Sequence, residues 1–235
     1  MKKVIFDTDI GIDDAMALLF LHHATDVDLI AITTGFGNAS VSDTTRNALY
    51  MKELFNMSAA VYAGAAMPVG SALGEGYADF VHGKNGLGDI PLTTPMCEAE
   101  AMPAAEAIVE LVRANSHELS IVAVGRMTNL AMALALDPEL PSLIKELIVM
   151  GGVFGYNGHR GNVSPVAEAN IAGDPLAADR VFTSGIPTTI VGLDVTAETV
   201  MNEAYIDQLR QSAGASGEFI HQISRFYFGF YEKVI

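Results

Sequence analysis

The segment KVIFDTDIGIDDA, residues 3–15, joins a short apolar run to a loop that carries four carboxylates. Lys2 to Phe6 is rich in β-branched and aromatic residues, which predicts a buried strand. From Asp13 to His23 the apolar residues recur at helical spacing, so we expect a helix that starts at the loop. The segment therefore predicts a strand, an acidic loop at its carboxyl end and a following helix.

The rest of the chain continues this alternation of strands and helices. Further strands are expected at 27–34, 59–63, 119–124, 147–150 and 188–193, and helices at 42–55, 104–115, 128–135, 175–184 and, for the most part, 202–233. Two glycine-rich stretches, 70–95 and 155–165, are expected to be surface loops. The pattern predicts one α/β domain over residues 1–235, a Rossmann-like open and mostly parallel sheet with helices on both faces. Ligands of such sheets bind beyond the carboxyl ends of the strands.

Composition excludes several functional classes. Thirteen Lys and Arg residues stand against twenty-eight Asp and Glu, a formal net charge of −15, which disfavours nucleic acid as a partner. Cys97 is the single cysteine, so an internal disulfide and a cysteine-based zinc site are excluded. The apolar run after Met1 is too short for a signal peptide, and no run reaches transmembrane length. We therefore expect a cytoplasmic protein without a membrane partner.

Four carboxylates lie close together in the acidic loop, and their mutual repulsion needs an explanation. Asp13 and Asp14 lie where the start of a helix favours negative charge, but this does not explain Asp7 and Asp9. Gly11 is expected to let the backbone turn sharply between the two pairs, so that the acids can face one point. Oxygen ligands of this kind suit Ca²⁺ or Mg²⁺, and Ca²⁺ accepts ~6–8 of them. A metal site is therefore the favoured interpretation over helix capping alone.

The loop also carries a resemblance. Asp7-Thr8-Asp9-x-Gly11-x-Asp13-Asp14-Ala15 resembles the opening signature of the inosine-uridine-type nucleoside hydrolases. Further matches follow in the order of that family, and they are Ile32-Thr33-Thr34 with Gly37-Asn38, Thr45 to Ala48, His82-Gly83, Thr128 to Ala131, Met150 to Gly152, and Val166 to Asn170 with Asp174-Pro175. The similarity covers essentially the whole chain. The fold of that family, an open α/β sheet, agrees with the alternation of strands and helices described above.

The resemblance implies an N-ribohydrolase that uses calcium. Its metal ligands would be Asp9, Asp14 and the main-chain carbonyl of Val124, and Asp9 would also be the catalytic base that takes a proton from the metal-bound water. The ribose hydroxyls would be bound by Asp13, Asn38, Asn162, Glu168 and Asn170. Carboxylates around the sugar suit this reaction, because the ribose gains positive charge as the base leaves.

The nucleobase side of the site is less sharply defined. Tyr227 and Tyr231 lie four residues apart, on one helix face, and by resemblance flank the base. Ordinary core or interface packing of these tyrosines is the alternative. His82 could stack on the base or be a solvated loop residue. The chain has no Trp, which favours a pyrimidine or mixed ribonucleoside as substrate. The family also implies a homodimer or homotetramer.

The chain departs from the family in two places. Ile10 stands where proline is usual, and Ile235 ends the chain before the region where relatives provide a His-Asp pair. The aromatic run at 226–231 favours a chain that lacks its C-terminal part, since an apolar helix normally packs against further structure. A second hypothesis is a weak or inactive nucleoside- or ribose-binding protein without the last metal ligand. A third is a phosphotransferase of the haloacid-dehalogenase kind, which also begins with Asp-x-Asp.

Overall fold

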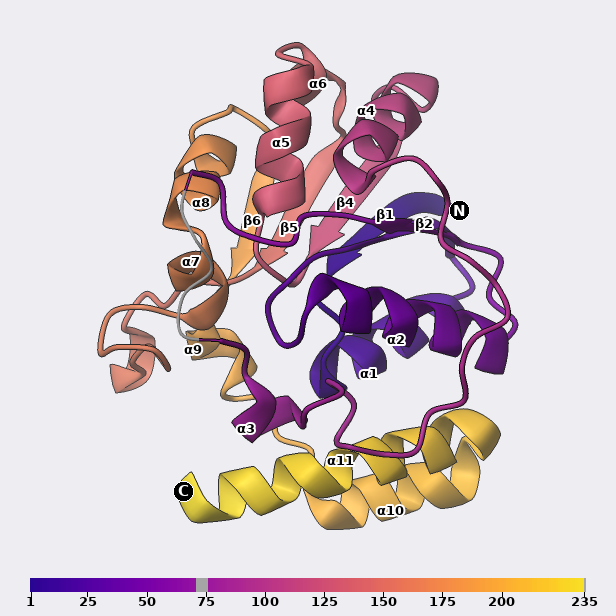
Figure 1. The fold of residues 1–235 in the computed structure, drawn as a ribbon. Helices are drawn as coiled ribbons and strands as arrows, with labels where there is room; N and C mark the ends of the chain where they lie inside the picture. The colour runs from indigo at the N-terminus through magenta and orange to yellow at the C-terminus, as the bar shows by residue number, and fades with distance from the viewer. Residues whose placement is uncertain (71–75, 235) are drawn as a thin grey trace.

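A parallel sheet forms the centre of the computed structural model, which describes residues 1–70 and 76–234 (Figure 1). Its six strands have the order β3-β2-β1-β4-β5-β6, and every neighbouring pair is parallel. The strands are β1 (Lys2–Thr8), β2 (Val27–Thr34), β3 (Ala60–Ala63), β4 (Leu119–Ala123), β5 (Glu146–Met150) and β6 (Thr188–Val191). The predicted fold class is confirmed.

Helices cover both faces of the sheet. One face carries α4 (Ala104–Ala114), α5 (Thr128–Leu136), α6 (Leu140–Leu143) and α8 (Pro175–Phe182), and the other carries α1 (Ile12–His23), α2 (Val41–Leu54), α10 (Glu203–Ser212) and α11 (Gly214–Val234) (Figure 1). The short helices α3 (Asp79–His82), α7 (Ala169–Gly173) and α9 (Leu193–Thr196), with the 3-10 turn η1 (Tyr156–Gly158), lie in the connections. None of the helices in the described residues is long and apolar enough to cross a membrane.

The strand sequence explains the two cores. Ile5 and Phe6 are adjacent in β1 and fully buried, and they pack into different clusters because successive strand residues point to opposite faces. Ile5 packs with residues of α4, α5 and α8, whereas Phe6 packs with residues of α1, α2 and α11. A strand buried on both faces has no polar side, which is why the run reads as continuously apolar.

Several predicted boundaries need correction. The strand expected at 188–193 ends at Val191, because residues 193–196 form the one-turn helix α9. The glycine-rich stretch at 70–95 is expected to be a surface loop; its residues 71–75 lie outside the described residues, and its described part contains helix α3. The stretch at 155–165 contains η1. The last helical stretch is divided into α10 and α11. By contrast, β2 occupies the predicted residues 27–34 without change.

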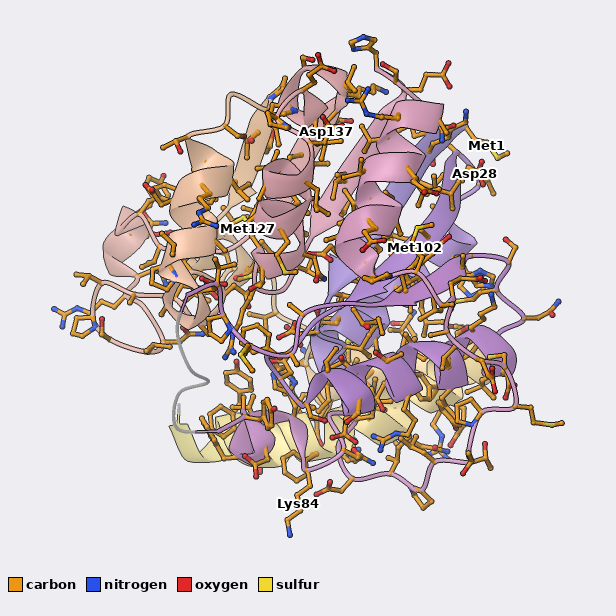
Figure 2. The ribbon with its side chains drawn as sticks, turned by 45° about the horizontal axis from the view of Figure 1, so that its top comes forward. Met1, Asp28, Lys84, Met102, Met127 and Asp137 are labelled. Carbon is orange, nitrogen blue, oxygen red and sulfur yellow. The ribbon has the colours of Figure 1, made fainter. Side chains whose placement is uncertain are left out.

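The order of the strands places the site. The chain leaves β1 towards β2 on one side and β4 leads towards β5 on the other, so the loops after β1 and β4 diverge and leave a crevice between them. Met127 and Asp137, both marked in Figure 2, cap the two ends of α5, and the crevice lies at the Met127 end. The acidic loop follows β1 directly, so the fold brings it to this crevice.

Candidate active site

Asp9 follows β1 directly, at the sheet edge where the loops after β1 and β4 diverge. Its side chain is only 2% exposed, and its Oδ2 accepts a hydrogen bond of 2.8 Å from the backbone N–H of Asn38. Its Oδ1 is buried and has no hydrogen-bond partner among the described residues. Burial raises the pKa of Asp9 to about 7, against the opposing effects of the Asn38 N–H and the Arg126 guanidinium. A carboxylate with one free oxygen and a pKa near neutrality can accept a proton.

Two glycines make room for this carboxylate. A Cβ on Gly37, in the β2–α2 connection, would lie 1.8 Å from Oδ2 of Asp9, and one on Gly125, after β4, would lie 2.8 Å from Oδ1. Neither glycine has a positive φ, so the requirement is for space and not for an unusual backbone conformation. The backbone of the β2–α2 loop and that of the β4–α5 loop therefore close on Asp9 from two directions.

Asp14 lies beside Asp9 and is joined to it by Asn38. Its Oδ2 accepts hydrogen bonds of 2.8 Å from Asn38 Nδ2 and 2.8 Å from the Gly11 N–H, and its Oδ1 accepts one of 3.0 Å from Thr8 Oγ1. Burial and the neighbouring charge of Asp9 raise the pKa of Asp14. The bond from Gly11 confirms the helix-capping role for Asp14, so capping and proximity to Asp9 occur together.

The expectation that all four acids face one point is wrong. Asp7 is bound elsewhere, because its Oδ1 accepts hydrogen bonds of 2.6 Å from Thr33 Oγ1 and 2.9 Å from Asn129 Nδ2. Asp13 points outward, and its side chain is 61% exposed. Burial raises the pKa of Asp7 to about 6 although both hydrogen bonds oppose this. Only Asp9 and Asp14 form a buried pair of neighbouring carboxylates in the loop.

The reason given for Gly11 also needs correction. Its φ of −100° is open to any residue, so no sharp turn requires glycine here. A Cβ on Gly11 would instead lie 2.5 Å from Asn38 Nδ2 and 2.6 Å from His82 Nδ1. The absence of a side chain at Gly11 therefore lets Asn38 and His82, which come from distant segments, lie against the acidic loop.

His82 and the two tyrosines form one aromatic group beside the loop. His82 is 6% exposed, which rules out the alternative of a solvated loop residue. Its Nδ1 accepts a hydrogen bond of 3.2 Å from the Ile12 N–H, and burial lowers its pKa, so the ring is neutral with its proton on Nε2. The ring centroids of His82 and Tyr227 are 5.6 Å apart, and those of Tyr227 and Tyr231 are 4.9 Å apart. Tyr231 is 40% exposed.

The remaining candidates come from the other side of the crevice. Asn170 Nδ2 donates to the Val124 carbonyl at 2.8 Å and to the Met150 carbonyl at 3.1 Å. Glu168 is 2% exposed and caps α7, and it accepts hydrogen bonds from the N–H groups of Asn170 and Gly152. Asn162 is exposed, and its Oδ1 accepts from the Ala169 N–H. These residues form a second polar group. It lies next to the Asp9–Asp14 pair, because Gly125, the residue after Val124, packs against Asp9.

The donor set fits a hard cation in part. Asp9, Asp14 and the Val124 carbonyl supply only oxygen ligands, and the orphaned Oδ1 of Asp9 is the kind of buried atom that a cation would satisfy. No group of three His, Cys, Asp or Glu side chains suited to a metal occurs within residues 1–70 and 76–234. Two carboxylates and one carbonyl are fewer than the ~6–8 oxygens that Ca²⁺ accepts, which leaves positions for water and a sugar.

Three charged or amide side chains, of which Asn129 and Asp194 are buried, have contacts that the sequence does not predict. Asn129 ties Asp7 to the Thr34 carbonyl and to the Ala65 N–H. Asp194 accepts hydrogen bonds of 2.7 Å from the N–H groups of Phe154 and Tyr156 and thereby fixes the start of the loop before Asn162. Arg126 follows Gly125, whose backbone closes on Asp9. Only its position after a strand, at the predicted ligand edge, could have marked Arg126 in the sequence.

Comparisons with known proteins agree with this geometry. The chain matches the family described as inosine-uridine preferring nucleoside hydrolase over residues 4–235, and it belongs to that family. It is 40% identical over 227 residues to uridine nucleosidase 1 of Arabidopsis thaliana and 35% identical over 226 residues to the pyrimidine-specific ribonucleoside hydrolase RihB of Escherichia coli. The aligned part is 96% of this chain in both cases, and it is 66% and 70% of these relatives.

Solved structures extend the agreement to the fold. A plant nucleoside hydrolase superposes with a TM-score of 0.94 at 37% identity, covering 99% of this chain and 72% of that protein. The purine-preferring ribonucleoside hydrolase of Gardnerella vaginalis gives a TM-score of 0.94 at 35% identity, covering 99% and 74%. These matches exclude the phosphotransferase hypothesis. The Escherichia coli relative is described as pyrimidine-specific and the Gardnerella vaginalis protein as purine-preferring.

Proposed function

We propose that this protein hydrolyses the N-glycosidic bond of ribonucleosides, with pyrimidine or mixed base specificity, to give ribose and the free base. The observation that carries the proposal is the Asp9 carboxylate, which is buried between two glycines, has one unpartnered oxygen and lies next to Asp14. The similarity to a uridine nucleosidase and to a pyrimidine-specific hydrolase supports the substrate class.

Asp9 would act as the general base. Its Oδ2 is held by the Asn38 N–H, which leaves Oδ1 to remove a proton from the attacking water. In the metal-free protein the pKa of Asp9 is about 7, and a general base works best when its pKa is close to the working pH. As the nucleobase departs, the ribose gains oxocarbenium character, and the Asp9–Asp14 pair would stabilise that positive charge.

Asp9, Asp14 and the Val124 carbonyl would hold Ca²⁺ in this site. When bound, the ion would lower the pKa of the attacking water and orient it. The Asn170 amide occupies one lone pair of the Val124 carbonyl, and the second lone pair of that oxygen stays available for a ligand.

The polar groups on both sides of Asp9 would bind the sugar. The proposed contacts to the ribose hydroxyls come from Asp13, Asn38, Asn162, Glu168 and Asn170. The Asp13 side chain is 61% exposed, with its Oδ1 3.8 Å from Nδ1 of His82, and it is available to a hydroxyl donor. Oε2 of Glu168 already accepts two N–H groups and Oε1 accepts one, so Oε1 can accept a further bond from a hydroxyl. Several such contacts would hold the ribose in one orientation for attack.

Metal removal tests the proposed activity. The protein incubated with uridine or inosine and Ca²⁺ is expected to release ribose, measured as reducing sugar. Treatment with EGTA is expected to lower the rate by about 100-fold or more, because the ion supplies several kcal/mol of transition-state stabilisation. Added Ca²⁺ is expected to restore the rate. An unchanged rate in EGTA would contradict the calcium dependence, and absence of ribose under all conditions would contradict the hydrolase.

A nucleobase contact by His82 is tested by two substitutions. His82→Ala is expected to lower kcat/KM for uridine by about 10- to 100-fold, the range that loss of one aromatic stacking partner gives. His82→Phe keeps a ring beside Tyr227 and is expected to retain more of the activity. Both variants lose the acceptor for the Ile12 N–H, so their unfolding temperatures form a matched control. Equal losses in the two variants would assign the contribution to the Nε2–H donor and exclude stacking.

A nucleoside- or ribose-binding protein with little turnover is the second candidate. It is favoured by one observation, that within the described residues the proposed metal ligands number two carboxylates and one carbonyl. Calorimetric binding of uridine without any release of ribose would support it. The homodimer or homotetramer implied by the family stays a prediction, which light scattering can check.

A further inference from the structure

Arg126 is a cation at the sheet edge that the proposed chemistry does not use. It follows Gly125 in the β4–α5 connection, directly after the backbone that closes on Asp9. Its side chain is half-buried, with Cζ 4.5 Å from the centroid of the Phe36 ring. It makes neither a hydrogen bond nor an ion pair with any residue of the described ranges 1–70 and 76–234. A cation on an aromatic face is favoured, and this contact fixes one side of the guanidinium.

The backbone of Gly173 packs against the other side of the Arg126 side chain. A Cβ at this position, at the end of α7, would lie 2.1 Å from Nε of Arg126 and 2.6 Å from its Cδ. Gly173 has no positive φ, so its backbone would accept alanine and only the space taken by Arg126 forbids it. The Arg126 side chain is thus held between a ring from the β2–α2 loop and the bare backbone of α7. This is a built position and not the random placement of a surface arginine.

The charges around this position are mostly negative. Asp9 and Asp14 are buried as neighbours, and Asp13 adds a third negative charge near them. Like charges in a poorly solvated site repel each other unless a cation or protons compensate. Arg126 opposes the upward shift of the Asp9 pKa, and Asp9 and Asp174 in turn favour the charged form of Arg126 against burial. Because arginine stays protonated in proteins, its charge is permanent.

We propose that Arg126 is a built-in counter-cation of the acidic loop. It is a positioning residue that stabilises the buried Asp9 carboxylate when no metal is bound, and its charge weakens the binding of a divalent cation to that carboxylate. The first half stands on the place of Arg126 between Phe36 and Gly173, directly after the Gly125 backbone that closes on Asp9. The second half rests on the calcium site of the proposed function, and the two halves are separated in the experiment.

The first half is tested without metal. Thermal unfolding in EGTA at pH 8.5 is compared for the wild type, Arg126→Met, Asp9→Asn and the double variant. Arg126→Met is expected to lower the Tm by about 3 °C in the wild-type background and by less than half of that in the Asp9→Asn background. Arg126→Lys keeps the charge and is expected to lose less than Arg126→Met. Equal losses in both backgrounds would overturn the proposal.

The second half is tested by titrating Ca²⁺ into the metal-free protein in a calorimeter. Arg126→Met is expected to bind Ca²⁺ about tenfold more tightly than the wild type, and Arg126→Lys within about threefold of it. Equal or weaker binding by Arg126→Met would overturn the competition with calcium. If neither the wild type nor the variants bind Ca²⁺, the calcium site of the proposed function fails, and the EGTA comparison alone decides the role of Arg126.

Gly173→Ala tests the packing of Arg126 against Gly173. Its Cβ displaces Arg126 without removing the charge from the protein, so this variant is expected to reproduce the Tm loss and the tighter Ca²⁺ binding of Arg126→Met. In an Arg126→Ala background the same change meets no arginine and is expected to leave the Tm unchanged or raised, since alanine favours a helix over glycine. If Gly173→Ala lowers the Tm in that background as well, the space at Gly173 is not needed for Arg126.

Discussion

Replacing Asp9 by alanine is expected to reduce kcat for ribose release by about 1,000-fold or more while the protein stays folded. The loss follows from the general-base role, which typically contributes ~10²–10⁴-fold, and from the loss of one of two neighbouring carboxylates beside the positive charge that develops on the sugar. Asp9→Asn keeps the acceptor for the Asn38 N–H and is expected to lose as much activity, because an amide cannot take the proton. Steady-state kinetics with uridine and a thermal unfolding curve measure both effects.

The matched control for Asp9 is Asp28→Asn. Asp28 lies at the amino end of β2, at the edge of the sheet opposite the site, as its label in Figure 2 shows. It pairs in register with Lys3 and takes no part in the crevice. Its substitution is expected to change kcat by less than about twofold, because a distant surface charge in high dielectric is strongly screened. Turnover retained by Asp9→Asn at the level of Asp28→Asn would exclude the role given to Asp9.

The fold could be predicted largely because the strands are short apolar runs between recognisable turns. β2 was placed without error, since Val27 to Thr34 is a β-branched run closed by a glycine-containing turn. β6 was extended too far for a physical reason. Residues 193–196 have the composition of a strand, but Asp194 binds the N–H groups of Phe154 and Tyr156, and the chain turns into α9. That interaction joins segments about forty residues apart, which local patterns do not contain.

The site could be predicted in its residue types but not in its grouping. Four acids in eight residues indicated a charged site, and the sequence placed it at the correct sheet edge. Asn129 draws Asp7 away from the others and Asn38 joins Asp9 to Asp14, and both come from distant segments. The same holds for Gly11, whose small size serves Asn38 and His82 and not a turn. These pairings are tertiary and cannot be read from spacing.

Gly37→Ala is expected to reduce activity by about 100-fold or more, although it adds a single methyl group. The new Cβ would lie 1.8 Å from Oδ2 of Asp9, far inside contact distance, so either the carboxylate or the β2–α2 loop must move. Movement of Asp9 breaks its bond to the Asn38 N–H and moves the free Oδ1 away from its working position. A displacement of about 1 Å in a catalytic group is enough for a loss of about 10²-fold.

Gly35→Ala is the matched control, two residues earlier in the same loop. Its Cβ would meet only Asn129 Nδ2, at 3.6 Å, an ordinary van der Waals contact, and its φ is not positive. This variant is expected to stay within about threefold of wild-type kcat/KM, because no catalytic group has to move. The contrast separates the space around Asp9 from a general need for flexibility in the loop. If the two variants lose activity equally, loop flexibility and not the fit of the Asp9 carboxylate controls turnover.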